Sequence, residues 1–98
     1  MYQPKFYKTI DREKIADDAR LAGFGPVEIF DEPDFVYPPH QHKQANLLIF
    51  LEGEMTLTVG GDKHICKPGD KLLIPAETVH FGKVGDKGCL YFWSQKKI

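Results

Sequence analysis

The stretch that decides the fold is EMTLTVGGDKHICKPGDKLLI, residues 54–74, because short apolar runs alternate in it with residues that favour turns. The segment MTLTV at 55–59 alternates apolar side chains with threonines, so its apolar side chains leave one face of an extended chain. The triplets at 60–62 (GGD) and 68–70 (PGD) supply glycine and proline where hairpin turns need them. The stretch therefore predicts antiparallel strands with one buried face.

The same pattern occurs elsewhere within this stretch and continues on both sides of it. Further β-like runs lie at residues 26–30, 46–52, 63–66, 71–74, 79–84 and 89–94, and the GDKG segment at 85–88 is expected to join the last two as a hairpin. The runs NLLIFLE and CLYFW are apolar on both faces. Such strands must be covered twice, once by a barrel interior and once by a helix or another subunit, so we expect a homodimer.

Residues 11–22, DREKIADDARLA, place Ile15, Ala19 and Ala22 at helical spacing, with Asp11 as the expected N-cap and Gly23 as the stop. The predicted fold class is mainly β, an antiparallel sandwich or barrel with a short N-terminal α-helix. We expect one domain over residues 1–98, with an N-terminal segment at 1–24 and the barrel at 26–98.

Composition excludes several classes of function. Residues 11–34 carry eight acidic against three basic side chains, and residues 35–98 carry eight basic against six acidic ones, so neither part forms the basic stripe that nucleic-acid binding requires. The N-terminus lacks the apolar core of a signal peptide, which predicts a cytoplasmic protein without membrane contact. Cys66 and Cys89 have no CxxC spacing and are interpreted as small buried hydrophobic residues.

The segment PPHQHKQAN at 38–46 contains the first candidate metal ligands. Side chains at i and i+2 leave the same face of an extended chain, so His40 and His42 can project together, and the two prolines before them favour that conformation. An HxH pair alone also arises by chance on surface strands. A third histidine, His80, follows KLLIPAET in another predicted strand and could join the pair.

These histidines and their spacing resemble the cupin family over residues 34–84. The first cupin motif runs Gly, five residues, His-x-His, three or four residues, Glu, six residues, Gly, and the corresponding places here hold Asp34, His40, His42, Asn46 and Gly53. The second motif runs Gly, five residues, Pro-x-Gly, two residues, His, three residues, Asn, and here Gly69, Pro75, Glu77, His80 and Val84 occupy those places. The resemblance implies a double-stranded β-helix, or jelly-roll barrel, that holds a divalent metal on three histidines and a carboxylate. His40, His42 and His80 match the histidine ligands, and Asn46 stands where the glutamate would be.

An asparagine in place of the glutamate offers at best a carbonyl oxygen as a weak neutral ligand. Alternatively, Asn46 begins a strand and bonds backbone or a histidine ring N–H, which leaves a three-histidine site for Zn, Fe, Mn or Ni. Glu77 lies in the turn before His80 and is either a solvated turn residue or a group at the barrel mouth. His64 lies outside both motifs and is interpreted as a strand surface residue.

The expected pocket is small and largely apolar. Parity with His80 and Asn46 gives its candidate lining residues as Leu48, Phe50, Gly82 and Val84, with Tyr37, Phe92 or Trp93 as an aromatic wall. We expect no second constellation of titratable groups deep in the barrel. The predicted function is a small cupin whose three-histidine metal acts on or binds a small molecule. The alternative is a non-catalytic ligand-binding or interaction cupin with a degenerate metal site.

Overall fold

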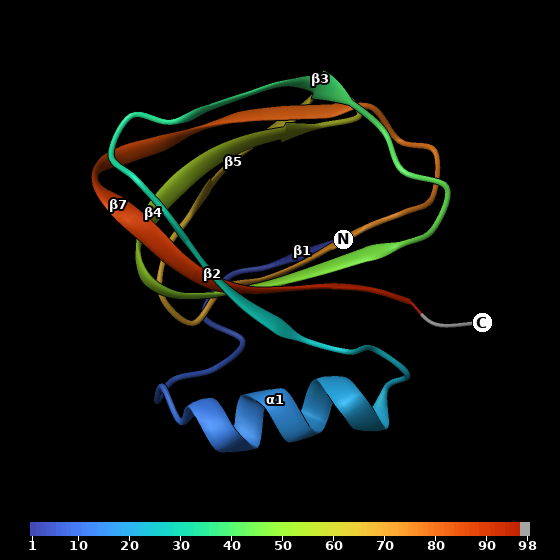
Figure 1. Cartoon of the computed structure of the whole chain (residues 1–98), viewed down its shortest axis with the longest axis vertical. Helices are drawn as coiled ribbons and strands as arrows, with labels where there is room; N and C mark the ends of the chain where they lie inside the picture. The colour runs from blue at the N-terminus through green and yellow to red at the C-terminus, as the bar shows by residue number, and fades with distance from the viewer. Residues whose placement is uncertain (97–98) are drawn as a thin grey trace.

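The computed structural model describes residues 1–96 (Figure 1). Along the chain its elements are β1 (Tyr2–Gln3), α1 (Arg12–Leu21), β2 (Val27–Asp31), β3 (Val36–His40), β4 (Asn46–Val59), β5 (Asp62–Cys66), β6 (Lys71–Ile74) and β7 (His80–Gln95). Hydrogen bonds join the strands in the order β1-β6-β4-β7-β2, with β3 paired to β7 and β5 paired to β4, and every pair is antiparallel. This arrangement confirms a mainly β fold with one short helix.

Strands β4 and β7 are longer than the sequence predicted. The runs at 46–52 and 55–59 belong to one strand, as do residues 80–84 and the run at 89–94, and the hairpin predicted at 85–88 was wrong. The two strands pair along most of their length, and the register shifts twice, between Phe50 and Glu52 and between Gly53 and Met55. The shifts bend the strands rather than ending them. Gly53 has a φ of +72°, and a Cβ there would lie 2.0 Å from the Gly88 carbonyl oxygen, so the bend requires glycine.

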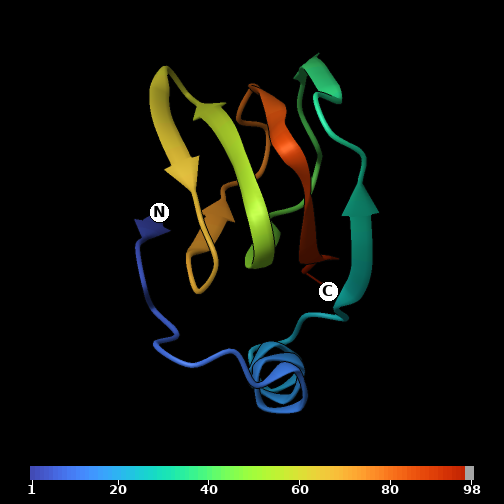
Figure 2. The same ribbon diagram turned by 90° about the vertical axis from the view of Figure 1, so that its left-hand side faces the viewer.

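The bent strands β4 and β7 are shared by two layers, which gives the chain its barrel shape (Figures 1 and 2). One layer contains β3, β5 and the halves of β4 and β7 that pair with them, and the other contains β1, β2, β6 and the remaining halves. Between the layers lies a core formed by Leu48, Phe50, Met55, Leu57, Val59, Cys66, Leu72, Ile74, Val84, Cys89 and Tyr91. The jelly-roll prediction is thereby confirmed, and both free cysteines are buried as expected.

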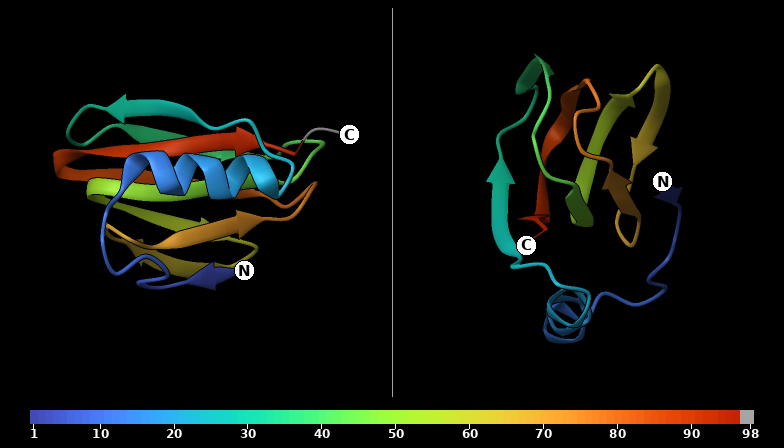
Figure 3. Two further views of the ribbon diagram at one scale, coloured as in Figure 1. Left: turned by 90° about the horizontal axis from the view of Figure 1, so that it is seen from below. Right: turned by 90° about the vertical axis from the view of Figure 1, so that its right-hand side faces the viewer.

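Helix α1 covers the outer face of one layer, where Figure 3 shows it lying over β4 and β7. Its buried side chains join a second core with the outward-facing apolar residues of those strands: Ile15, Ala16, Ala19, Phe24, Leu47, Ile49, Leu51 and Phe92. The predicted face was wrong at one position, because the helix ends at Leu21 and Ala22 is its exposed C-cap. Since the helix covers strands that are apolar on both faces, that feature no longer requires a second subunit, and the homodimer stays a prediction.

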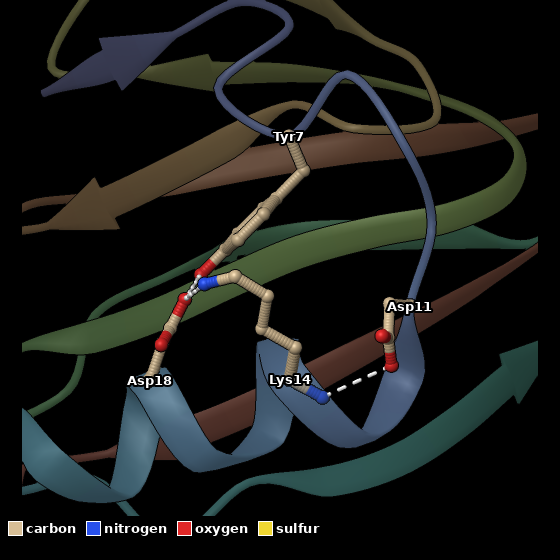
Figure 4. Close-up of polar contacts among 4 residues, drawn as sticks. All are labelled: Tyr7, Asp11, Lys14 and Asp18. Carbon is tan, nitrogen blue, oxygen red and sulfur yellow. Dashed lines mark hydrogen bonds and ion pairs between the residues drawn. The ribbon is translucent and has the colours of Figure 1, made fainter.

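Polar contacts hold the helix to the segment before it (Figure 4). Asp11 caps the first turn, accepting a hydrogen bond from the Lys14 backbone N–H at 3.2 Å. The Asp18 carboxylate accepts hydrogen bonds from Tyr7 Oη at 2.9 Å and from Lys14 Nζ at 3.1 Å. The bond from Lys14, and after it the bond from Tyr7, lowers the pKa of Asp18. Tyr7 also donates its backbone N–H to the Gly69 carbonyl, which attaches the helix to the turn at 68–70.

None of the helices in residues 1–96 has the length and apolar character needed to cross a membrane.

Candidate metal centre

Three histidines meet where β3 ends and β7 begins. His40 is the last residue of β3 and pairs with His80, the first residue of β7. His42 lies just beyond β3, so the two histidines of the HxH pair do not share a strand as the sequence suggested. The Glu77 N–H donates to the His42 carbonyl at 2.7 Å and holds that loop against the turn before β7.

The three rings converge closely. Their centroids are 4.2 Å apart for His40 and His80, 5.0 Å for His40 and His42, and 5.3 Å for His42 and His80. One nitrogen from each ring lies within 4.8 Å of the others, which is close enough for the three to share a single ion. His80 is buried, and the other two are half-buried.

Backbone carbonyls orient two of the three rings. Nδ1 of His40 lies 2.7 Å from the Pro38 carbonyl oxygen, and Nδ1 of His80 lies 2.9 Å from that of Thr78. A carbonyl only accepts hydrogen bonds, so Nδ1 of each neutral ring carries the proton and Nε2 keeps a free lone pair. This pattern, with one ring nitrogen held by the protein and the other free, is typical of histidines that bind metal ions.

The environment also favours neutral imidazoles. Burial, and to a lesser extent the neighbouring His40, lowers the pKa of His42. Burial is likewise the main cause that lowers the pKa of His80, reinforced by His40 and His42 and partly opposed by its hydrogen bond to Thr78. Because only the neutral ring donates a lone pair to a metal, both shifts increase the fraction of binding-competent histidine near neutral pH.

Asn46 is the first residue of β4, paired with Ile74 on one side and Gln95 on the other. Its side chain is 1% exposed and lines the same cavity as the histidines. Its Oδ1 is the buried side-chain polar atom without a hydrogen-bond partner among residues 1–96. The predicted strand start is therefore correct, whereas the alternative role of Oδ1 as an acceptor from backbone or a histidine ring is not seen. An unpaired buried oxygen beside three imidazoles leaves an acceptor free for an ion or a ligand.

The histidines form the polar end of a cavity of about 280 Å³ between the two layers. The residues that line it are Ile29, Tyr37, His40, His42, Asn46, Leu48, Met55, Leu57, Ile74, His80, Tyr91 and Trp93. Leu48, Tyr37 and Trp93 were predicted correctly. Phe92 was assigned wrongly, because it faces helix α1, and three further candidates do not line the cavity, namely Phe50, Gly82 and Val84.

A second group of titratable side chains adjoins the cavity, contrary to expectation. Tyr37 Oη and Tyr91 Oη each donate to Asp31 Oδ2 at 2.7 Å, and the two hydroxyls lie 3.1 Å apart. Burial is the main cause that raises the pKa of both tyrosines, that of Tyr37 to about 12. Parity with Trp93 could have identified Tyr91, but no local signal connects either tyrosine with Asp31.

The remaining candidates lie outside the cavity. Glu77 is an exposed turn residue with a φ of +59°, and Asp34 has a φ of +63°. Both stand at glycine positions of the cupin motifs, which explains why those motifs prefer glycine. His64 is half-buried on β5 and packs against the Tyr2 ring, with centroids 4.6 Å apart.

Solved cupin structures share this architecture. The RmlC-like cupin from Shewanella frigidimarina has a TM-score of 0.69 at 18% identity over 78% of this chain and 68% of its own. The cupin domain of Cnp3 from Schizosaccharomyces pombe has a TM-score of 0.70 at 13% identity over 78% of this chain and 57% of its own. The DMSP lyase DddQ from Ruegeria pomeroyi has a TM-score of 0.69 at 20% identity, but this chain covers only 39% of it. At these identities the likeness shows the fold alone.

Comparison with curated proteins gives no match. A sequence model of the AraC-like ligand binding domain family matches residues 27–95, which span the barrel from β2 to the end of β7. The matched segment contains the three histidines, the cavity-lining residues and both layers of the sheet. The chain therefore has the cupin fold and belongs to the family of AraC-like ligand binding domains.

Proposed function

We propose that this protein binds a small oxygen-bearing molecule at a divalent metal ion held by His40, His42 and His80. The observation that carries the proposal is the convergence of three ring nitrogens within 4.8 Å of one another at the polar end of a largely apolar cavity. Asn46 would act as a weak fourth ligand or orient the bound molecule. The description of the family as ligand binding domains supports a binding role.

The residues present fit a metal ion. Three neutral imidazoles suit zinc, iron, nickel or manganese and leave coordination positions for water or a ligand oxygen. The free Asn46 Oδ1 is a neutral acceptor that such an ion could satisfy. Because an amide adds no negative charge, the ion would be bound less tightly than with a carboxylate. The bound ion would act as a Lewis acid toward an oxygen of the ligand.

The protein itself supplies position and exclusion of water. The carbonyls of Pro38 and Thr78 fix the tautomer and orientation of two histidine rings. Apolar side chains such as Leu48, Leu57 and Ile74 form the walls, so a ligand is held mainly by contact with these walls and by few polar groups.

A catalytic role is the second candidate, and the polar group formed by Asp31, Tyr37 and Tyr91 is the observation that favours it. General acid–base catalysis needs titratable groups near the bound substrate, and a pure scaffold does not. No turnover by the metal-loaded protein across small phenols, thiols and keto acids would favour the binding role.

The test of the metal site is the metal content per chain, measured by elemental mass spectrometry on protein purified without a metal-affinity tag. After reconstitution with iron, zinc, manganese or nickel, we expect about one ion per chain in the wild type and none in His42→Ala. The matched control is His64→Ala, which removes a histidine outside the cavity and should leave the content unchanged. Absence of metal in the wild type, or equal content in His42→Ala, would refute the proposal.

The role of Asn46 is tested by restoring the carboxylate of the cupin motif. Asn46→Glu should tighten metal binding in a competition titration, because an anionic ligand is added to the three imidazoles. Unchanged or weaker affinity would place Asn46 outside the set of metal ligands.

A further inference from the structure

The group formed by Asp31, Tyr37 and Tyr91 connects three separate strands beside the cavity. Tyr37 comes from β3, Tyr91 from the second half of β7 and Asp31 from the end of β2. Both tyrosines line the cavity, and their hydroxyls meet at Asp31 Oδ2. The Tyr37 ring also lies next to the His40 ring, with centroids 6.3 Å apart. Tyr37 therefore extends from the histidines to the carboxylate.

This group lies closer than the histidines to the bend of β4 and β7, at what we call the inner end of the cavity. Asp31 pairs with Cys89, which lies beside the bend of β7 and opposite Gly53 of β4. His80 is the first residue of β7 and lies in the other layer, beside the loops that follow β3 and β6 (Figure 1). The cavity thus has the three histidines toward its loop end and the two tyrosines toward the bend.

The hydrogen bonds decide what this inner end can bind. Each tyrosine has a single hydroxyl hydrogen, and both hydrogens are used within the group, because each hydroxyl lies 2.7 Å from Asp31 Oδ2 and the two hydroxyls lie 3.1 Å from each other. The hydroxyl oxygens therefore keep only lone pairs for a ligand, so they accept hydrogen bonds from it. Tyrosine is protonated at neutral pH at its ordinary pKa of about 10, and burial raises the pKa of both residues further.

Charge favours a cationic donor over a neutral one. None of the cavity-lining residues found among residues 1–96 is Lys or Arg, and Asp31 forms no ion pair with a residue in that range. A carboxylate without a cationic partner, placed behind two tyrosine hydroxyls, attracts a positively charged group of a ligand more strongly than it attracts a neutral hydroxyl of a ligand. The aromatic residues Tyr37, Tyr91 and Trp93 line the same space, and aromatic rings also attract cations over their faces.

We propose that the Asp31–Tyr37–Tyr91 group is a second recognition point that binds the ammonium group of a small ligand. Together with the metal centre of the proposed function, on which this part rests, it selects an amino-substituted oxyacid or carbonyl compound. The oxygen of that ligand meets the ion at the histidines, and its ammonium group lies between the tyrosines.

The inner recognition point can be tested without metal, because Trp93 is the single tryptophan of the chain and lines the cavity. Its fluorescence would be titrated in metal-free protein with n-butylammonium, 1-butanol and butyrate at one ionic strength. We expect n-butylammonium to bind at least fivefold more tightly than 1-butanol and butyrate to bind weakest. Equal binding of the three probes, or a preference for butyrate, would overturn the proposal.

Variants assign this preference to the group. Asp31→Asn removes the charge and should abolish the preference for the ammonium probe, whereas the control Glu32→Gln removes a charge from the exposed neighbouring residue and should preserve it. Tyr37→Phe serves as the second variant if Asp31→Asn does not fold, and should reduce the preference at least threefold. A variant that is less stable but keeps the full preference would show that the group only joins the strands, and would overturn the proposal.

The arrangement of two recognition points is tested in metal-loaded protein. Straight-chain ω-amino carboxylates of increasing length would be compared with plain carboxylates of the same length. We expect one chain length at which the amino group improves binding at least tenfold. If no length shows this gain while one ion per chain is retained, the second recognition point is refuted and the metal site stands. If instead the protein retains no metal but the metal-free protein still prefers the ammonium probe, the metal site is refuted and the second recognition point stands.

Discussion

Asn46→Leu should make the metal-free protein more stable and should reduce the stabilisation that the protein gains from binding metal. Asn46 is 1% exposed, and its Oδ1 has no hydrogen-bond partner among residues 1–96. A buried acceptor without a partner costs about 1–3 kcal/mol. Leucine has a similar shape, and the adjoining cavity has room for its methyl groups. We therefore expect the free energy of unfolding to rise by about 1–2 kcal/mol, since part of the penalty is relieved beside the cavity.

Urea unfolding and thermal melts, each with and without metal, measure the stability of the metal-free and the metal-loaded protein separately. In metal-free protein the gain corresponds to about 4–8 °C of Tm for each kcal/mol in a domain of about this size. At a metal concentration one hundred times Kd, the wild type gains about 2.7 kcal/mol, and a variant with tenfold weaker affinity gains only about 1.4 kcal/mol. Metal should thus cancel most of the advantage of the variant.

The control is Gln41→Leu, the same kind of change at an exposed amide between the two histidines, which should alter the free energy of unfolding little. A metal-free Asn46→Leu variant that is less stable by more than about 1 kcal/mol would mean that Oδ1 has a partner in solution, and the reasoning would fail. An equal gain from metal in both proteins would exclude Asn46 from the metal site.

Three further predictions concern pH, strain and association. The pKa values of His42 and His80 are lowered in the folded state, so the folded metal-free protein binds fewer protons than the unfolded chain. Its stability should be greatest above the unfolded histidine pKa of about 6.5 and should fall as the pH decreases through that value. Urea unfolding between pH 8 and 5 should show a smaller loss of stability in His42→Gln than in the wild type. Glu77→Gly should stabilise by about 0.5–1 kcal/mol, because glycine relieves the positive φ while losing some backbone entropy, whereas the control Glu77→Ala keeps the strain, and equal melting of the two variants would contradict this. Light scattering on the wild type should give twice the mass of one chain, and a monomeric wild type would contradict the homodimer. Phe81→Lys, in the exposed groove that contains Val36 and Phe81, should produce monomers.

Two features of the site were predicted correctly, one from alternation within a single segment and the other from the resemblance to the two cupin motifs. Alternation in MTLTV buries Met55, Leu57 and Val59 on the inner face as expected. The spacing of the two motifs identified three histidines whose rings do converge, although His42 reaches the others from a loop rather than from the strand.

Other features depend on what lies across the sheet. The glycine-rich segment at 85–88 has the composition of a turn, yet it continues β7, because the neighbouring strand β4 is bulged there and Gly53 approaches the Gly88 carbonyl. Local residues cannot distinguish a turn from a bulged bend, since the difference lies in the partner strand. The assignment of Phe92 failed for a similar reason, because CLYFW is apolar on both faces and only its partners show which face meets the helix.

The sequence by itself determined the mainly β class and the short helix with its Asp11 cap, because periodicity and caps act over a few neighbouring residues, and its resemblance to the cupin motifs identified the candidate histidines. Only the tertiary structure decided that Asp31 and Tyr91, 60 residues apart in the chain, share a hydrogen bond beside the cavity. Such a contact depends on strand register and on the bend of two long strands. Both result from pairing over the whole sheet, which no local stretch of residues specifies.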